Sequence, residues 1–112
     1  MKVAIIGGRD FKNYSLLKST MSKIKGISCV VSGGALGADY LAEIYAKQNN
    51  IHTLIFQADW ARFGRSAGPK RNKTIVQNSQ LVVAFWDGTS KGTKNTINQA
   101  KILGVKVIIV SY

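Results

Sequence analysis

The segment Val30–Asp39, with the sequence VVSGGALGAD, decides the fold of this chain. It begins as an apolar run, passes through the glycines Gly33 and Gly34, and resumes as a helical pattern after Gly37. A strand that ends in glycines and turns into a helix leaves several backbone N–H groups unpaired at one point, where the helix dipole favours negative charge. The segment therefore indicates either an ordinary tight strand-to-helix turn or a turn that binds an anion.

The same alternation of apolar runs and helical patterns extends along the 112-residue chain. Strands are predicted at residues 2–6, 27–31, 52–56, 81–85 and 106–110. Helical spacing predicts a first helix through Leu17, Met21 and Ile24, ended by Gly26, and further helices at residues 36–48, 69–78 and 92–103. These patterns predict a Rossmann-like, doubly wound α/β fold: a five-stranded parallel sheet covered on both faces by four main helices. The length fits a single domain over residues 1–112.

The composition is strongly basic, with 16 Lys and Arg against 5 Asp and Glu and a formal charge of +11. Such a charge either attracts the phosphates of a nucleotide or nucleic acid, or serves only solubility. The longest apolar runs are too short for a membrane span, so no membrane partner is expected. The single cysteine, Cys29, lies in a predicted buried strand and is interpreted as a core residue, which favours a cytoplasmic protein without disulfides.

Four of the five carboxylates lie where a predicted strand ends or the next element begins. They are Asp10, Asp39, Asp59 and Asp87. The segments that follow the strands also hold most of the glycines and loop aromatics: Gly7–Phe11, Ser32–Asp39, Asp59–Asn72 and Trp86–Thr93. Because ligands of doubly wound domains bind beyond the carboxyl ends of the strands, we expect these segments to form one binding site at that edge.

Cations occupy the first turns of the third and fourth predicted helices, where they oppose the helix dipole. Lys70 and Arg71 begin the third helix, and Lys91 and Lys94 begin the fourth. Two helix N-termini flanked by cations predict an anion between them, and Arg71 can hold a phosphate in bidentate fashion. The alternative is that exposed cations of a basic protein fell there by chance.

Other side chains leave two interpretations open. Trp60, Phe63 and Trp86 lie in or beside loops, where they either stack on a nucleobase or close the top of the core. Asp39 either caps its helix or accepts hydrogen bonds from ribose hydroxyls. His52 is the only histidine, so neither a histidine metal site nor a Ser-His-Asp triad is predicted. We expect no metal and no required cofactor, but a nucleotide-like ligand.

Five motifs, in this order and spacing, resemble a known family. They are GGRDF, SGGALGAD, ADW, AGPKRN and FWDGTSKGT, and together they span nearly the whole chain. The set is similar to the small YspA-like, YpsA-related members of the SLOG superfamily. This superfamily includes the LONELY GUY phosphoribohydrolases, the DNA-processing protein A family and sensor domains for nucleotide-derived signals such as ADP-ribose-type molecules. The resemblance implies a Rossmann-like fold and admits a homodimer, since relatives often dimerise.

The resemblance also implies where the ligand lies, in the segments 7–10, 32–39, 68–72 and 87–93. Combined with the residue analysis above, it gives the following candidate ligand-binding residues: Gly7, Gly8, Arg9, Asp10, Ser32, Gly33, Gly34, Gly37, Asp39, Asp59, Trp60, Gly68, Lys70, Arg71, Asn72, Trp86, Asp87, Gly88, Ser90, Gly92 and Thr93.

One departure from the phosphoribohydrolases bears on activity. Their PGGxGTxxE stretch carries the carboxylate used in glycosidic cleavage, whereas the matching segment here begins at Trp86 without the proline and continues into Lys94, Asn95 and Thr96. Arg71 does match the arginine that those enzymes use near the phosphate. The resemblance thus implies phosphate binding without the usual acid.

Three functions follow in order of preference. The first is a protein that binds a nucleotide or a nucleotide-derived molecule, as a sensor or by sequestering it. The alternative is an N-glycosidic hydrolase of nucleoside monophosphates that uses Arg71 with Asp87 or Asp39. The third is binding of single-stranded nucleic acid, favoured by the net charge.

Overall fold

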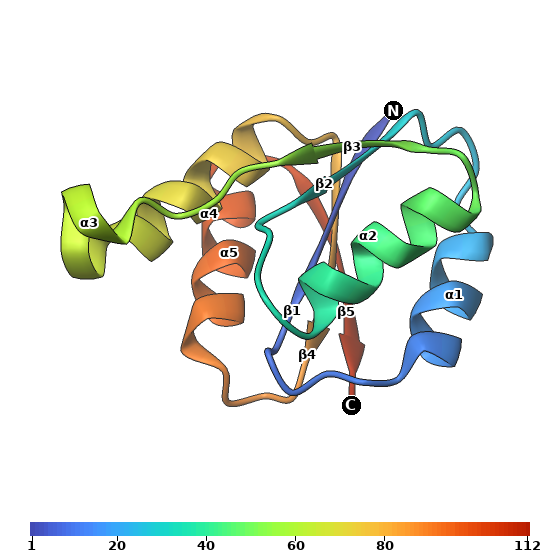
Figure 1. Cartoon of the computed structure of the whole chain (residues 1–112), viewed down its shortest axis with the longest axis horizontal. Coiled ribbons are helices and arrows are strands. Elements are labelled where there is room, and N and C mark those ends of the chain that lie inside the picture. Colours follow the sequence, from blue (N-terminus) through green and yellow to red (C-terminus); the bar gives the residue numbers. More distant parts are fainter.

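Five parallel strands form one sheet in the order β3-β2-β1-β4-β5 (Figure 1). The computed structural model describes all 112 residues. The strands are β1 (Lys2–Gly7), β2 (Cys29–Ser32), β3 (His52–Ile55), β4 (Leu81–Trp86) and β5 (Lys106–Ser111). The main helices are α1 (Tyr14–Ser22), α2 (Ala38–Gln48), α4 (Ala67–Gln77) and α5 (Lys91–Ile102). The predicted doubly wound fold with five parallel strands and four main helices is therefore confirmed.

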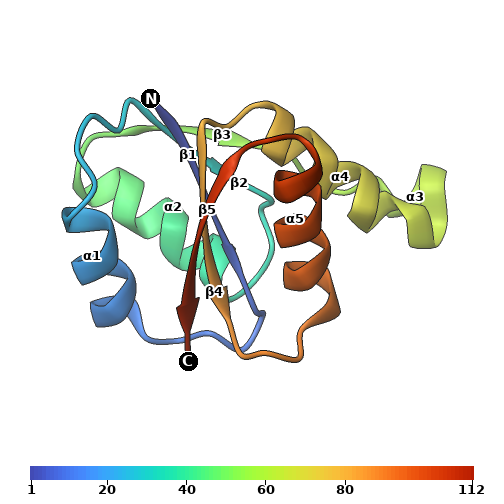
Figure 2. The same ribbon diagram turned by 180° about the vertical axis from the view of Figure 1, so that it is seen from behind.

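The sheet separates two helical layers. Helices α1 and α2 cover one face, and α4 and α5 cover the other, as the views from both sides show (Figures 1 and 2). Side chains alternate along β1 accordingly: Val3 and Ile5 belong to the core beneath α1 and α2, and Ala4 and Ile6 to the core beneath α4 and α5. No helix is both long and apolar enough to cross a bilayer.

Strand β1 is central and determines where the fold opens. It pairs with β2 through Ala4 and Val31, and with β4 through Ala4 and Val82. The chain leaves β1 toward β2 on one side and reaches β4 only after two further crossovers, so the strand order reverses between β1 and β4. A ligand crevice is expected beyond the carboxyl ends of these two strands.

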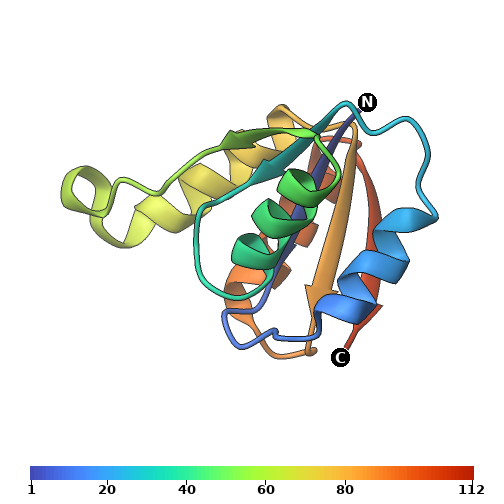
Figure 3. The same ribbon diagram turned by 45° about the vertical axis from the view of Figure 1, so that its right-hand side comes forward.

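A short helix that the sequence analysis did not predict follows β3. Helix α3 (Trp60–Phe63) continues into a 3₁₀ turn, Gly64–Ser66, within the segment expected to be a plain connection. Asp59 begins it, because its Oδ1 accepts a 3.2 Å hydrogen bond from the backbone N–H of Arg62. No residue of α3 is buried, and the helix projects away from the sheet (Figure 3).

Three local predictions were wrong. The first helix ends at Ser22 rather than at Gly26, because α1 closes on its own carbonyls through the N–H of Lys23. The second begins at Ala38 rather than Leu36, because Gly37 has φ of +75° and so lies outside helical geometry. Cys29 is half-buried rather than buried, since it begins a strand that only β3 separates from the edge.

The edge strands also depart from the prediction of a sheet covered on both faces. Three of the four residues of β3 are exposed, including His52 and Ile55. Strand β5 contains only exposed and half-buried residues. The helices are too few to cover both faces of the outer strands, so complete burial is confined to the centre of the sheet.

Candidate functional site

A cavity of about 750 Å³ opens at the carboxyl edge of the sheet, where the strand order reverses. Its walls are the segments after β1, β2 and β4, the start of α3, and the first turns of α4 and α5. The predicted residues that line it are Gly7, Gly8, Arg9, Asp10, Asp39, Trp60, Gly68, Arg71, Asn72, Asp87, Ser90, Gly92 and Thr93. Residues from all four predicted segments, up to 86 positions apart, are thus brought together.

The close approach of α2 to β1 forms one wall. A Cβ on Gly7 would lie 2.6 Å from the carbonyl oxygen of Phe85 and 2.8 Å from Cβ of Ala38, so only glycine fits there. The backbone N–H of Ala38 donates a 3.2 Å hydrogen bond to the carbonyl of Gly8. This contact holds the start of α2 beside the cavity and brings Asp39 into it.

Arg71 and Asp39 meet across Gly33. Nη1 of Arg71 donates a 2.7 Å hydrogen bond to the carbonyl of Gly33. A Cβ on Gly33 would collide with that Nη1 and would lie 2.8 Å from Oδ2 of Asp39. The absence of a side chain at Gly33 therefore allows the guanidinium and the carboxyl to share one corner of the cavity.

Asp39 is the one buried carboxyl group of the cavity. Its side chain is 6% exposed, and Oδ2 accepts a 3.2 Å hydrogen bond from the N–H of Ala35. Burial raises its pKa from the ordinary 3.8 to about 6, against the opposing effects of that hydrogen bond and of Arg71. Near neutral pH this group is close to the point where it can accept or release a proton.

A chain of amide groups holds Arg71 in place. Nε of Arg71 donates to Oδ1 of Asn72 at 3.1 Å, and Nδ2 of Asn72 donates to Oδ1 of Asn95 at 3.0 Å and to the carbonyl of Gly92 at 3.4 Å. Asn72 is buried. The guanidinium on α4 is thereby tied to the first turn of α5.

The start of α5 carries the third carboxyl group of the cavity. Oδ1 of Asp87 accepts hydrogen bonds from the N–H groups of Thr89 (2.9 Å) and Ser90 (2.8 Å), and these bonds lower its pKa. The hydroxyl of Ser90 caps the helix by accepting from the N–H of Thr93 at 3.4 Å. Helix geometry leaves the N–H groups of Lys91 and Gly92 without intrahelical partners, and both residues line the cavity.

Tyr112, at the other end of the chain, orients the side chain of Asp10. The hydroxyl of Tyr112 donates a 2.7 Å hydrogen bond to Oδ1 of Asp10, and the Tyr112 ring packs edge-on against Phe11. Desolvation and this hydrogen bond raise the pKa of Tyr112, so the hydroxyl remains a donor. Phe11, expected in the loop, is instead a core residue stacked on Phe85.

Several predicted site residues lie outside this cavity. Trp86 closes the core, because its indole N–H donates to the carbonyl of Ser90 at 3.1 Å. The Nζ of Lys70 lies 5.1 Å from the ring centre of Phe63. The others outside the cavity are Ser32, which is buried, Gly33 and Gly34 in an adjoining hollow, Gly37 and Gly88 in turns with positive φ, and Asp59 at the start of α3.

Several residues of the cavity wall were not predicted from the sequence. Asn95 and Thr96 line the cavity three and four positions after Gly92, so helical spacing from that glycine was the available signal. Ile6 and Ile75 were also not predicted. Ala35, Pro69 and Lys91 lie within the predicted segments, and Lys91 is one of the cations expected beside the anion. No group of three or more His, Cys, Asp or Glu side chains is placed to hold a metal ion.

The family follows from a match over the first part of the chain. The YspA, cpYpsA-related SLOG family matches residues 1–63, which include β1, the turn after β2 and Asp39. The chain belongs to this family. The match confirms the resemblance inferred from the motifs. No curated protein matches the sequence.

The fold is similar to that of a solved structure. DNA processing protein A from Streptococcus pneumoniae aligns over 99% of this chain with a TM-score of 0.80 and 21% identity. This chain spans half the length of that protein. At this level of identity the likeness concerns the fold.

Proposed function

We propose that the protein binds a nucleotide or a nucleotide-derived small molecule in the cavity at the carboxyl edge of the sheet. The observation that carries this proposal is the meeting of Arg71 with the first turn of α5 in a cavity of about 750 Å³. That volume lies within the range of small-molecule sites. Membership of the SLOG family and the fold shared with a DNA-processing protein support a role connected with nucleotides or nucleic acid.

The cavity residues divide by the chemistry they offer. Arg71, Lys91 and the N–H groups at the start of α5 hold the phosphate, because a guanidinium, an ammonium and a helix N-terminus all favour an anion. The carboxyl groups of Asp10 and Asp39 face the same cavity and accept hydrogen bonds from ribose hydroxyls. Trp60 presents an exposed aromatic face for the base.

A second candidate is N-glycosidic hydrolysis of a nucleoside monophosphate. The burial and the raised pKa of Asp39 favour it. A buried carboxyl with a pKa of about 6 can deliver a proton to the leaving base. Asp87, whose pKa is lowered, stays ionised and stabilises the positive charge that develops on the ribose ring. In this reaction water replaces the base at the anomeric carbon, and ribose 5-phosphate is released.

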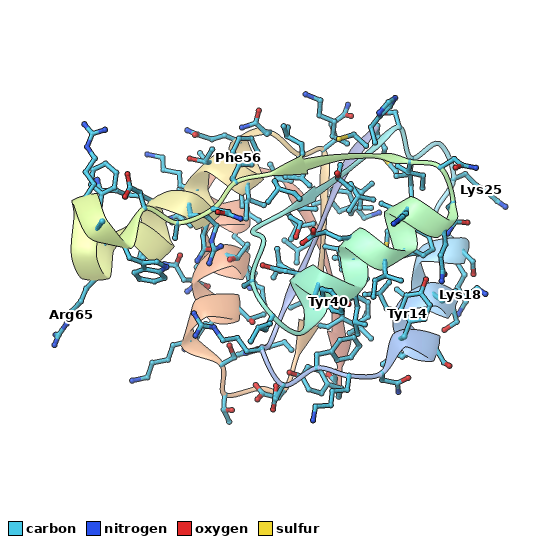
Figure 4. The ribbon with its side chains drawn as sticks, viewed as in Figure 1. Tyr14, Lys18, Lys25, Tyr40, Phe56 and Arg65 are labelled. Carbon is cyan, nitrogen blue, oxygen red and sulfur yellow. The ribbon has the colours of Figure 1, made fainter.

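Single-stranded nucleic acid is the third candidate, favoured by the surface of α3. Arg62 and Lys70 lie 4.9 and 5.1 Å from the ring centre of Phe63, and Trp60 is exposed on the same short helix. Arg65 extends from this end of the molecule into solvent (Figure 4). Surfaces on which cations alternate with aromatic rings bind single-stranded nucleic acids.

One experiment separates the three. Native mass spectrometry of the freshly purified protein, alone and with a panel of nucleoside monophosphates and ADP-ribose-type molecules, detects retained or added mass. Chromatography of the same mixtures detects free base. Added mass without free base supports binding, and free base with ribose 5-phosphate supports hydrolysis, which Asp39→Asn then stops. If neither result is obtained and the protein binds single strands in a salt-sensitive manner, the small-ligand proposal is contradicted.

A further inference from the structure

A second hollow, of about 360 Å³, adjoins the main cavity. Four residues line both spaces: Arg9, Ala35, Trp60 and Arg71. The remaining walls come from the turn after β2 and from the segment after β3, and they are Gly33, Gly34, Leu36, Gln57 and Ala58. Because two arginines and a tryptophan stand where the spaces meet, one ligand can extend from the cavity into the hollow.

Charge is distributed unevenly between the two spaces. The charged side chains of the hollow, Arg9 and Arg71, both stand on the wall shared with the cavity, whereas the cavity also contains three aspartates and a lysine. The hollow is otherwise neutral, and two large apolar side chains, Leu36 (73% exposed) and Trp60 (51% exposed), are open to solvent at its walls. A neutral, flat group therefore fits the hollow, and a charged group fits the cavity.

Gln57 gives the hollow an exposed polar group beside the turn after β2. Its side chain lies against the turn after β2, since a Cβ on Gly34 would be 3.0 Å from Cγ and 3.3 Å from Nε2 of Gln57. A side-chain amide both donates and accepts, as the hydrogen-bonding edge of a nucleobase requires. The residue follows β3, so it lies at the same carboxyl edge as the cavity.

We infer that the second hollow is the subsite for the nucleobase, with Trp60 and Leu36 against the plane of the base and Gln57 on its edge. This inference rests on the proposed function, because it requires the phosphate and ribose in the main cavity. It narrows the ligand class to molecules that keep their base, and it makes Gln57 a residue that determines which base is bound.

Calorimetric titration tests the inference with five probes: ribose 5-phosphate and the 5′-monophosphates of adenosine, guanosine, cytidine and uridine. The wild type is compared with Gln57→Leu and with the matched control Gln77→Leu, an exposed glutamine at the end of α4. We expect the best nucleotide to bind roughly five- to hundredfold more tightly than ribose 5-phosphate, from stacking. We expect Gln57→Leu to weaken that nucleotide about three- to tenfold and to leave ribose 5-phosphate unchanged.

The outcomes distinguish this inference from the proposal on which it rests. Equal affinities for ribose 5-phosphate and all four nucleotides, or a Gln57→Leu variant that keeps the affinity and order of the wild type, would overturn the base subsite and leave the phosphate site standing. Failure of every probe to bind the wild type would overturn both. An equal effect of Gln77→Leu would also count against the subsite, since that residue is remote from the hollow.

Discussion

Nη1 of Arg71 donates a 2.7 Å hydrogen bond to the carbonyl of Gly33, across 38 positions of sequence. This bond joins the first turns of α4, on one face of the sheet, to the turn that leads into α2, on the other. It also places the guanidinium beside Asp39, because both groups would contact a Cβ on Gly33. The proposed phosphate-binding residue is therefore positioned by a glycine that does not line the main cavity.

Gly33→Ala tests that relationship. The added Cβ meets Nη1 of Arg71 and Oδ2 of Asp39, so one of them must move. Because the atoms met are the ends of side chains, we expect a loss of only about 1 kcal/mol in the free energy of unfolding, from the hydrogen bond between Arg71 and Gly33, measured by urea denaturation. Nucleotide affinity should also fall although no charge is removed.

The matched control is Gly92→Ala, whose Cβ would meet no atom within 4 Å. This variant should keep or slightly raise the stability, because alanine favours a helix over glycine by up to about 1 kcal/mol. Equal destabilisation by both variants would contradict the role given to Gly33.

Stability should depend on pH through Asp39. Its pKa is about 6 in the folded protein, against an ordinary value of 3.8. Between these values the folded state binds more protons than the unfolded state. The stabilisation from protonated Asp39 is therefore complete below pH 4 and is lost as the pH rises through 6. The expected loss is on the order of 3 kcal/mol.

Asp39→Asn removes this dependence while keeping the size of the side chain. In urea denaturation at pH 4 and pH 8, the variant should be more stable than the wild type at pH 8 and similar to it at pH 4. Asp87→Asn is the matched control, because hydrogen bonds lower the pKa of Asp87 and its contribution to stability changes only below about pH 4. This variant should therefore keep the pH dependence of the wild type between pH 4 and 8. A wild-type stability that is flat from pH 4 to 8 would refute the assignment to Asp39.

Asn72→Ala should affect both the fold and the site. The variant leaves Nε of Arg71 and the side chain of Asn95 without their partner, which costs about 1–3 kcal/mol of stability. Nucleotide affinity should fall with it, since the guanidinium loses one of its two attachments. Asn78→Ala is the matched control, because the side chain of Asn78 donates a hydrogen bond only to the carbonyl of Thr74 in the preceding helix. An Asn78→Ala variant that loses as much nucleotide affinity as Asn72→Ala would contradict the role given to Asn72.

The central fold could be predicted from the sequence because its signals are local. Apolar runs of five residues and glycines at their ends identify parallel strands, and the edge at which their carboxyl ends meet follows from topology. That reasoning placed Gly7, Asp39 and Arg71 near one another correctly. It could not place Lys70, since a first-turn cation can turn toward either side, and the ring of Phe63 draws this one away from the cavity.

The loop tryptophans could not be told apart for a similar reason. The sequence left Trp60 and Trp86 with the same two interpretations, and only the structure shows that the indole N–H of Trp86 donates to the carbonyl of Ser90 while Trp60 lines the cavity. The packing of Tyr112 on Phe11 and its bond to Asp10 join residues about a hundred positions apart. No periodic pattern in the sequence predicts a contact between residues so far apart.

The two tryptophans should report on the site differently. Trp60 lines the cavity, and Trp86 does not. In a Trp86→Phe protein, titration with a nucleotide should change the fluorescence, because a base stacked on Trp60 alters its surroundings. In the Trp60→Phe protein, the fluorescence of Trp86 should stay constant during the same titration. A response from Trp86 alone would mean that the ligand binds elsewhere.

The most direct test of the phosphate site is the calorimetric affinity of adenosine 5′-monophosphate for the wild type, Arg71→Ala and Lys70→Ala. These two cations are adjacent in α4, but only Arg71 lines the cavity. The account predicts that Arg71→Ala weakens binding at least about tenfold, as expected for a charged hydrogen bond. Lys70→Ala should change it less than about twofold. Equal losses in both variants, or strong binding retained by Arg71→Ala, would contradict the account.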